Sequence, residues 1–244
     1  MEKKIHELIM REGSMDNISI IIRNKNEEQH IGYAIQSCLD FFEKPEIIIV
    51  DNDSRDNSLD VVMFFNDRTD IKIINNKNYT PGKALNIGVK NASRDYVMIL
   101  SAHSQILKLD FKSIKKKLDT YIAIFGKQIP VHRGKKVTPG YIWTNFSNSQ
   151  SVNLYSDIEK RNFLHNAFCF YTKKTLTDYP MPENYFGKED RYWADKLVNS
   201  GMKLHHEPFQ PTTEDLHKNG KNFPPNFLHK SWMDYLYWDV ELEP

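Results

Sequence analysis

The side chains best suited to catalysis are two neighbouring carboxylates, Glu189 and Asp190. They stand at the expected start of a helix over residues 189–200, which Gly201 ends. A carboxylate beside a hydroxyl can take its proton while the oxygen attacks, which is general base catalysis. The alternative is that both acids only complement the positive end of the helix dipole. The first interpretation suits an enzyme, and the second a purely structural role.

A second polar group stands at the end of an apolar run, where Asp51, Asn52 and Asp53 follow residues 46–50. A carboxylate there can accept a hydrogen bond from the imino N–H of a pyrimidine or guanine base. The alternative is a cluster of helix-capping residues that binds no ligand. Further along, Lys83 can reach a phosphate or a ribose as a point charge, or it can be an ordinary solvated helix lysine.

The elements that position these residues alternate along the first half of the chain. Each β-branched run is followed by an amphipathic stretch, which predicts βαβ units, an α/β fold and a mostly parallel central sheet flanked by helices. Ligands of such sheets bind beyond the carboxyl ends of the strands, which singles out the loops 23–27, 51–56 and 101–105. The expected strands are 18–22, 46–50, 71–74 and 96–100, and the expected helices are 27–42, 58–66 and 83–91.

The second half is less regular, and no repeat or linker divides it from the first. We therefore expect one domain over residues 1–244. Besides the helix at 189–200, we expect a short amphipathic helix within residues 1–10, a helix at 112–118, a strand at 168–171, a helix at 226–238, and loops at 130–153 and 208–225.

Composition excludes several classes of protein. Lys and Arg number 33 against 32 Asp and Glu, a net charge of +1, which argues against a nucleic-acid-binding domain. The longest apolar runs fall well short of the roughly 20 residues that span a bilayer, and the first ten residues have no signal-peptide core. Cys38 and Cys169 are too few for a disulfide scaffold. A cytoplasmic protein is the expectation.

Four segments, taken in order, resemble the family-2 glycosyltransferases of the GT-A fold. Residues 18–27 (ISIIIRNKNE) are similar to the opening strand of that family, and residues 48–58 (IIVDNDSRDNS) to the turn after its second strand. Residues 82–88 (GKALNIG) resemble its third helix, and residues 187–194 (GKEDRYWA) its late acid motif. The resemblance covers roughly residues 17–207.

This resemblance implies transfer of a sugar from a nucleotide-sugar donor to a hydroxyl of a glycan or lipid-linked saccharide. It implies the inverting reaction, with Asp190 as base and Glu189 beside it. About residues 17–107 are then the donor half and 108–244 the acceptor half. A place at the inner face of the membrane stays open. The implied donor-binding residues are Asn26, Glu27, Asp51, Asn52, Asp53, Lys83, Asn86, Ser101 and His103.

One departure from the family pattern concerns the end of the fourth expected strand. The family places an Asp-x-Asp there to hold a divalent ion, whereas this sequence reads Ser101-Ala102-His103. One interpretation keeps a metal, held by His103 and the later His217, and favours Mn²⁺ over Mg²⁺ because imidazole is the softer ligand. A second has no metal, with His103 and Lys83 facing phosphate. A third is an inactive homologue.

Two other functions stay open. A sugar nucleotidyltransferase would need a Gly- and Arg-rich phosphate loop after the first strand, and residues 23–28 contain no Gly. A non-catalytic module that binds nucleotides or glycans would keep the fold and lose the reaction.

Overall fold

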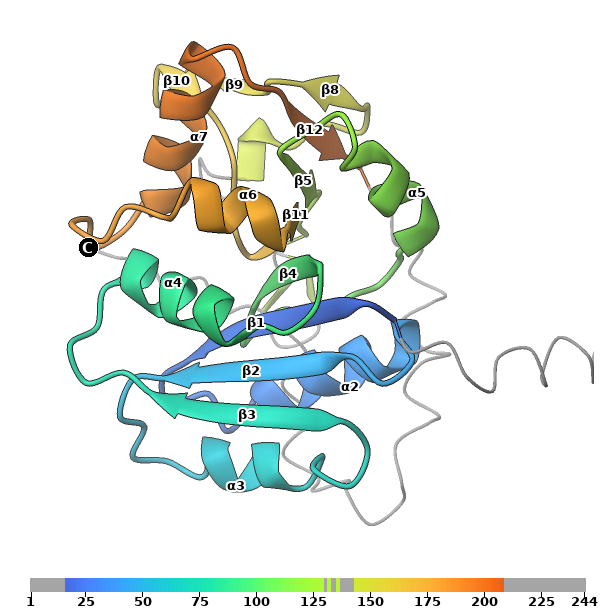
Figure 1. Ribbon diagram of the computed structural model, residues 1–244, viewed down its shortest axis with the longest axis vertical. Coiled ribbons are helices and arrows are strands. Elements are labelled where there is room, and N and C mark those ends of the chain that lie inside the picture. The colour runs from blue at the N-terminus through green and yellow to red at the C-terminus, as the bar shows by residue number, and fades with distance from the viewer. Residues whose placement is uncertain (1–15, 130, 133–134, 137–142, 209–244) are drawn as a thin grey trace, which may run out of the picture.

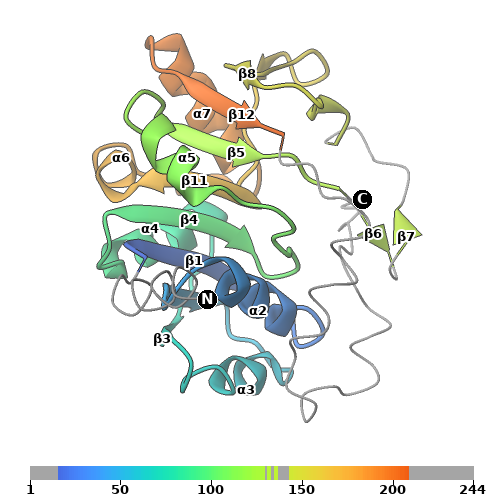
Figure 2. The same cartoon turned by 90° about the vertical axis from the view of Figure 1, so that its right-hand side faces the viewer.

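A mixed sheet of eight strands organises residues 16–129, 131–132, 135–136 and 143–208, the part of the chain that the computed structural model describes. The strand order is β3-β2-β1-β4-β11-β5-β12-β8, and Figure 2 shows the later strands stacked beyond β4. The bounds are β1 (Ile18–Asn24), β2 (Glu46–Asp51), β3 (Asp70–Asn75), β4 (Tyr96–Ser101), β5 (Ala123–Gly126), β8 (Ser151–Val152), β11 (Phe168–Thr172) and β12 (Leu204–Glu207).

Strands β1 to β4 are parallel and form the first half of the sheet. Both faces of β1 and β2 are covered, which explains their near-continuous isoleucine. Alternate residues serve opposite faces. Ile20 and Ile22 pack on the side of α2 (Ile31–Phe41) and α3 (Ser58–Met63), and Ile21 packs on the side of α4 (Pro81–Asn91) and α7 (Glu189–Asn199). Figure 1 shows α4 in front of these strands and α2 behind them.

Most of the helices lie close to where the sequence predicts them, but a short helix at Lys173–Asp178 was not expected. Thr80 caps α4 by accepting a hydrogen bond from the Lys83 N–H, and Pro81 occupies the first helical position, where a missing N–H costs nothing. The bounds are α2 (Ile31–Phe41), α3 (Ser58–Met63), α4 (Pro81–Asn91), α5 (Phe111–Lys117), α6 (Lys173–Asp178) and α7 (Glu189–Asn199), with one 3₁₀ turn, η1 (Trp143–Asn145).

Two glycines let α4 approach its neighbours closely. A Cβ on Gly88 would lie 2.5 Å from Cγ2 of Ile21 in β1. A Cβ on Gly82 would lie 2.0 Å from the carbonyl oxygen of Pro182. Helix α4 therefore packs closely against both the sheet and the segment that leads to α7. This packing fixes the position of Lys83 relative to both.

The second half departs from expectation in its strands. The expected strand at 168–171 forms as β11, but it runs antiparallel to β4 and to β5. Strands β5 and β12 pair in parallel at Ala123–Gly126 and Leu204–Glu207, and neither was expected. The expected loop at 130–153 contains β6 (Val131–His132), β7 (Lys135–Lys136), η1 and β8. Strands β9 (Tyr155–Ser156) and β10 (Arg161–Asn162) form a small hairpin.

Some expectations fall on residues that the structure does not describe. These are the short helix within residues 1–10, the helix at 226–238, His217 and most of the loop at 208–225. Within the described ranges, no helix is long and apolar enough to cross a membrane.

Candidate active site

The ends of three parallel strands and the start of one distant helix meet at one edge of the sheet. In the strand register, Asn24 of β1 lies beside Asp51 of β2, and Arg23 lies beside Ser101 of β4. Arg23 also bonds to Glu189 at the start of α7. The structure thus brings together the loop after β1, the turn after β2, the Ser101–His103 segment and the acid motif.

The turn after β2 is built around the buried Asp51 carboxylate. Its Oδ1 accepts hydrogen bonds from Asn24 Nδ2 at 2.8 Å and Ser54 Oγ at 2.6 Å, and its Oδ2 accepts from Ser54 N at 2.9 Å. Asn52 N donates to the Asn24 carbonyl at 2.9 Å, and Asp53 has a φ of 56°. Asp51 therefore shapes the turn. Its Oδ1 already accepts two hydrogen bonds, whereas Oδ2 accepts one and keeps capacity for a further donor.

The loop between β1 and α2 is joined to this turn by polar bonds. Asn26 has a φ of 53°. Its Oδ1 accepts from Arg55 N at 2.8 Å, and its N–H donates to Ser54 Oγ at 3.0 Å. Asp56 accepts from Glu28 N at 2.9 Å. The Asn26 side chain thus holds the neighbouring loop, and its contact with a donor stays a prediction.

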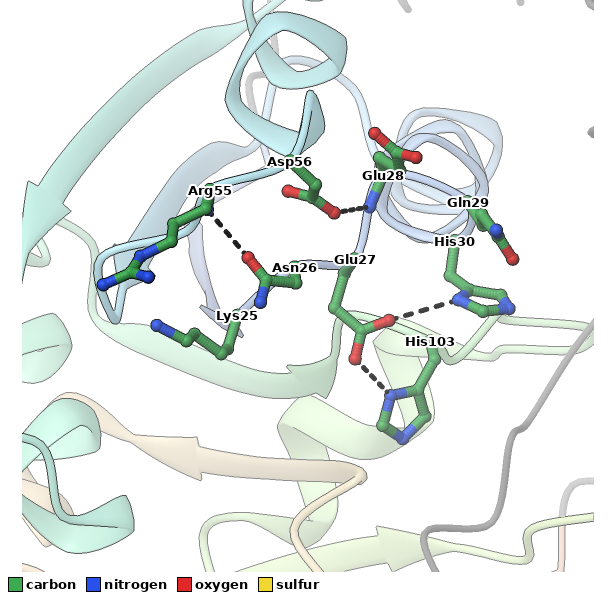
Figure 3. A pocket seen from close by; sticks show the side chains of 9 residues that line it. All are labelled: Lys25, Asn26, Glu27, Glu28, Gln29, His30, Arg55, Asp56 and His103. Atoms are coloured by element: carbon green, nitrogen blue, oxygen red, sulfur yellow. Dashed lines mark hydrogen bonds and ion pairs between the residues drawn. The ribbon is translucent and has the colours of Figure 1, made fainter.

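Glu27 joins two histidines in a pocket of about 720 Å³. Its Oε1 lies 2.9 Å from His103 Nδ1 and its Oε2 lies 3.2 Å from His30 Nδ1, and Figure 3 shows the carboxylate between the two rings. The other ring nitrogen of His103 lies 3.0 Å from Ser101 Oγ. Burial acts to raise the pKa of Glu27, but the hydrogen bonds with His103 and His30 outweigh it and lower the pKa to about 2.

Helix α4 contains two residues that are predicted to bind the nucleotide-sugar donor, and their side chains differ in their contacts. Lys83 is half-buried in the first turn, and its Nζ has no partner among the described residues. Both amide atoms of Asn86 are engaged: Nδ2 donates to the Met181 carbonyl at 2.9 Å and to Glu183, and Oδ1 accepts from Met181 N at 2.9 Å. Asn86 therefore ties α4 to the segment before α7, and its predicted contact with a donor remains untested.

The acid pair opens α7 as the sequence predicts. Glu189 Oε1 accepts a hydrogen bond from Arg23 Nη1 at 3.0 Å. Burial raises the pKa of Glu189, and the positive charge of Arg23 partly opposes that shift. The Asp190 carboxylate accepts from Asn166 N at 2.9 Å and from Arg191 N at 2.8 Å. The two acids thus have different partners, a guanidinium for one and backbone N–H groups for the other.

Three further side chains lie at this site and were not predicted to be functional: Arg23, Gln128 and His165. Arg23 begins the loop 23–27 that was expected at the ligand-binding edge, whereas Gln128 and His165 belong to no motif. His165 Nδ1 lies 2.7 Å from Gln128 Oε1, while Gln128 Nε2 faces the His165 carbonyl at 3.5 Å. Burial lowers the pKa of His165 to about 4, although the charge of Asp190 acts to raise it. A neutral imidazole that donates from Nδ1 keeps a lone pair on Nε2, which suits it to accept a hydrogen bond from a hydroxyl.

The start of α7 is held by a second set of contacts. Glu159, in the turn between β9 and β10, faces Arg191 Nε at 3.2 Å. Asp195 Oδ1 accepts from both the N–H and Nδ2 of Asn162 at 2.9 Å. These contacts fix the first two turns of α7 against the β9–β10 hairpin, and so they position Glu189 and Asp190.

Among the described residues, no three His, Cys, Asp or Glu side chains gather to hold a metal ion. At the predicted place the donor set is one imidazole and one carboxylate, His103 and Glu27, which face each other. His205 and His206 lie in β12, and two strands separate β12 from β4 in the sheet. The described donors alone therefore do not complete a cation site, and His217 lies outside them.

Most of this chain is similar in sequence to known glycosyltransferases. Residues 19–179 match the model of the glycosyl transferase family 2, a match that ends before the acid motif. A dolichyl N-acetyl-alpha-D-glucosaminyl phosphate 3-beta-D-2,3-diacetamido-2,3-dideoxy-beta-D-glucuronosyltransferase of Methanococcus voltae is 34% identical over 213 residues, 80% of this chain and 65% of that protein. A poly-beta-1,6-N-acetyl-D-glucosamine synthase of Staphylococcus epidermidis is 32% identical over 94 residues, 38% of this chain and 23% of its own. The chain thus spans less than two thirds of the length of these relatives.

Solved structures agree on the fold. S. aureus TarS 1-349 in complex with UDP superposes with a TM-score of 0.61 at 20% identity, covering 83% of this chain and 62% of that one. The mannosyltransferase PcManGT from Pyrobaculum calidifontis, in complex with GDP-Man and Mn²⁺, superposes with a TM-score of 0.59 at 16% identity, covering 84% and 61%. The expected GT-A fold, a mostly parallel central sheet flanked by helices, is confirmed.

Proposed function

The chain belongs to the glycosyl transferase family 2, and we propose that it transfers a sugar from a nucleotide-sugar donor to a hydroxyl of a glycan or lipid-linked saccharide. One observation carries this proposal: Arg23 at the end of β1 bonds to Glu189 at the start of α7. That contact holds the acid motif at the carboxyl ends of the parallel strands, which is the edge of the sheet where the turn of Asp51 begins. A donor bound over the strand ends would therefore have a carboxylate within reach of its sugar.

We assign donor binding to residues 17–107 and acceptor binding to 108–244. The turn at Asp51 suits a nucleobase, because its carboxylate is fixed and has accepting capacity left. Lys83 and His103 supply donors for the diphosphate. UDP and GDP are both candidates, because the TarS and mannosyltransferase structures contain UDP and GDP-Man respectively.

The reaction we propose is a single displacement with inversion. The acceptor oxygen forms a bond to the anomeric carbon of the sugar while the bond from that carbon to the phosphate oxygen breaks. Asp190 takes the hydroxyl proton, and the nucleoside diphosphate leaves with the electron pair of the broken bond. The backbone N–H groups on Asp190 hold its carboxylate in place, and Lys83 and His103 oppose the charge that develops on the leaving group.

None of the steps assigned to these side chains requires a metal ion. The mannosyltransferase structure contains Mn²⁺, but the described donors here are a single imidazole and a single carboxylate. A metal would act by neutralising the diphosphate, and imidazole would favour Mn²⁺ over Mg²⁺. EDTA distinguishes the two versions: activity lost in EDTA and restored by Mn²⁺ establishes metal dependence, and unchanged activity establishes the metal-free reaction.

We further propose that the protein works in the cytoplasm, where it would meet a lipid-linked acceptor at the inner face of the membrane. The match to the Methanococcus voltae enzyme, whose name describes a dolichyl-linked acceptor, supports such an acceptor. Cys38 and Cys169 are both buried and unbridged, which agrees with a reducing compartment. No nucleic acid partner is proposed.

The test has a binding step and a transfer step. UDP and GDP are first added in a thermal-shift assay, where a ligand at 100 times its Kd stabilises the fold by about 2.7 kcal/mol. Nucleoside diphosphate release is then measured from UDP- and GDP-sugars, with and without saccharide or lipid-phosphate saccharide acceptors. Release that depends on an acceptor supports the proposal. Binding without release indicates a non-catalytic homologue, and pyrophosphate formation from a sugar phosphate and a nucleoside triphosphate indicates a nucleotidyltransferase.

A further inference from the structure

Arg23 is a partly exposed arginine in the middle of the candidate active site. Its guanidinium makes one hydrogen bond, from Nη1 to Glu189 Oε1 at 3.0 Å, and 28% of its side-chain surface is exposed. A guanidinium has five N–H donors in a planar fork. No other hydrogen bond of this side chain is found within the part of the chain that the structure describes. One edge of the fork is thus occupied by Glu189, and the others are open to a ligand.

The position of Arg23 in the sheet places it between two parts of the site. Its neighbour in the strand register is Ser101, the residue that begins the segment of His103. Its side chain shares the face of Ile21, the face that α4 and α7 cover. It therefore extends toward α7, where the charges of Glu189 and Asp190 both favour its positive form.

The geometry of a single displacement indicates what lies beside Arg23. The base and the leaving phosphate stand on opposite sides of the anomeric carbon, so the transferred sugar lies between them. In the proposed reaction the base is Asp190, and the phosphate is held by His103 and Lys83. Because Arg23 is bonded to Glu189, the residue next to the base, its open N–H donors can reach a sugar held in that position.

The charges around Arg23 determine which kind of sugar would bind more tightly through a contact with its guanidinium. A sugar with only hydroxyl groups can be held by neutral amides. A sugar that carries a carboxylate would be repelled by Glu189 and Asp190 unless a cation lay between them. Arginine matches a carboxylate with two parallel N–H···O bonds, and these are among the stronger hydrogen bonds in proteins.

We propose that the open edge of Arg23 binds a carboxylate on the transferred sugar, so that the donor is a nucleotide-linked acidic sugar such as a uronic acid. This inference rests on the proposed function, because it assumes a nucleotide-sugar at the strand edge. Glu189 holds the guanidinium in place through its other edge, which makes Glu189 the positioning residue for this contact.

The experiment compares acidic and neutral donors that share a nucleotide. Affinities are measured by calorimetry for UDP-glucuronate against UDP-glucose and for GDP-mannuronate against GDP-mannose, with UDP and GDP alone as references. The wild-type protein should bind the acidic member of one pair about 10- to 100-fold more tightly, as a charge-assisted pair of bonds predicts. Arg23→Met should abolish this preference and leave the affinity for the nucleoside diphosphate unchanged.

Two further variants separate recognition from a structural ion pair. Arg68→Met is the matched control, since Arg68 lies just before β3 at the opposite edge of the sheet and bonds to Gln36 at 2.7 Å; it should keep the preference. Glu189→Gln removes the charge of the ion-pair partner but keeps an amide oxygen that can accept from Arg23 Nη1. The guanidinium should therefore stay in position, and the preference for the acidic donor should remain.

Each remaining outcome overturns the inference in a recognisable way. Equal affinity for acidic and neutral donors shows that Arg23 does not select a carboxylate. Loss of UDP or GDP affinity in folded Arg23→Met shows that the guanidinium contacts the diphosphate instead. Loss of the preference in Glu189→Gln as well as in Arg23→Met shows that the ion pair acts only on structure. Failure of every nucleotide to bind the wild-type protein rejects the proposed function itself.

Discussion

His103 Nδ1 lies 2.9 Å from Glu27 Oε1, so the segment after β4 is bonded to the loop after β1. The two residues are 76 positions apart in the chain. The bond orients an imidazole at the place where the family pattern has an acid pair, and it keeps a carboxylate ionised beside that imidazole. It therefore links the position of the predicted phosphate ligand to a charge that pH can remove.

The first prediction concerns that charge. The pKa of Glu27 is about 2 in the folded protein against an ordinary value of 4.5. Because the folded pKa is depressed, the Glu27 cluster contributes stability that is fully present above pH 4.5 and is lost as the pH falls toward 2. Glu27→Gln should therefore lower the free energy of unfolding at pH 7 and approach the wild-type value near pH 2. Urea unfolding across this range measures the difference.

The control for this experiment is Glu43→Gln, which changes an exposed glutamate away from the site. It should follow the wild-type stability curve. A Glu27→Gln penalty that stays constant from pH 7 to pH 2 would contradict the assignment of the stability to an ionised Glu27.

The second prediction concerns His103. His103→Ala should reduce transfer by about 10²–10³-fold, because a group that opposes charge on the leaving phosphate is lost. His30→Ala removes the other histidine on Glu27 and should cost far less, since His30 belongs to the start of α2 rather than to the strand edge. Initial rates with saturating donor measure both. Equal losses in the two variants would mean that only the orientation of Glu27 matters.

The third prediction concerns Asp51. Asp51→Ala should weaken nucleotide binding and leave the chain folded, with a loss of stability of about 1–3 kcal/mol because Asn24 Nδ2 and Ser54 N lose their acceptor. Calorimetry with UDP and GDP, together with urea unfolding, measures the two effects. Asp60→Ala, an exposed change in α3, is the control. Unchanged nucleotide affinity in a folded Asp51→Ala protein would remove Asp51 from the donor site.

The parallel half of the sheet could be predicted because its signal is local. Runs such as residues 47–50 are apolar and β-branched, and strands buried on both faces need only that pattern. Strand β12 shows the opposite case. Its residues include His205, His206 and Glu207, and they are extended because the backbone pairs with β5. Such pairing between distant segments leaves no pattern in the residues themselves.

The residues of the candidate site also differ in how far the sequence alone predicts them. The rule that ligands bind at the carboxyl ends of parallel strands directs attention to Asp51 and His103, and the acid pair is visible as a motif. Arg23 looks like a solvated arginine at the end of a strand, because its partner Glu189 is 166 positions away. His165 belongs to no motif, and only its contact with Gln128 and its nearness to Asp190 identify it.

The fourth prediction tests the seating of α4. Gly88→Ala should destabilise the protein by about 1–3 kcal/mol, because its Cβ would lie 2.5 Å from Ile21 Cγ2 and one of them must shift. Gly187→Ala is the matched control, since a Cβ there meets nothing within 4 Å. Unfolding in urea compares them. A Gly88→Ala protein as stable as the wild type would show that α4 is free to move away from β1.

The fifth prediction concerns the proposed base. Asp190→Asn should lower turnover by about 10²–10⁴-fold, because an amide cannot take the proton of the acceptor hydroxyl. Donor affinity should change little, since the carboxylate is bonded to Asn166 N and Arg191 N rather than to the turn of Asp51. The amide keeps one accepting oxygen for those two N–H groups, so stability should fall by about 1–3 kcal/mol, and rates are measured well below the unfolding temperature. Asp178→Asn, which changes an exposed aspartate paired with Lys174, controls for loss of a carboxylate elsewhere and should keep full activity. Wild-type turnover of Asp190→Asn with saturating acceptor would assign the base to another group, of which Glu189 and His165 are the candidates that the geometry places nearby.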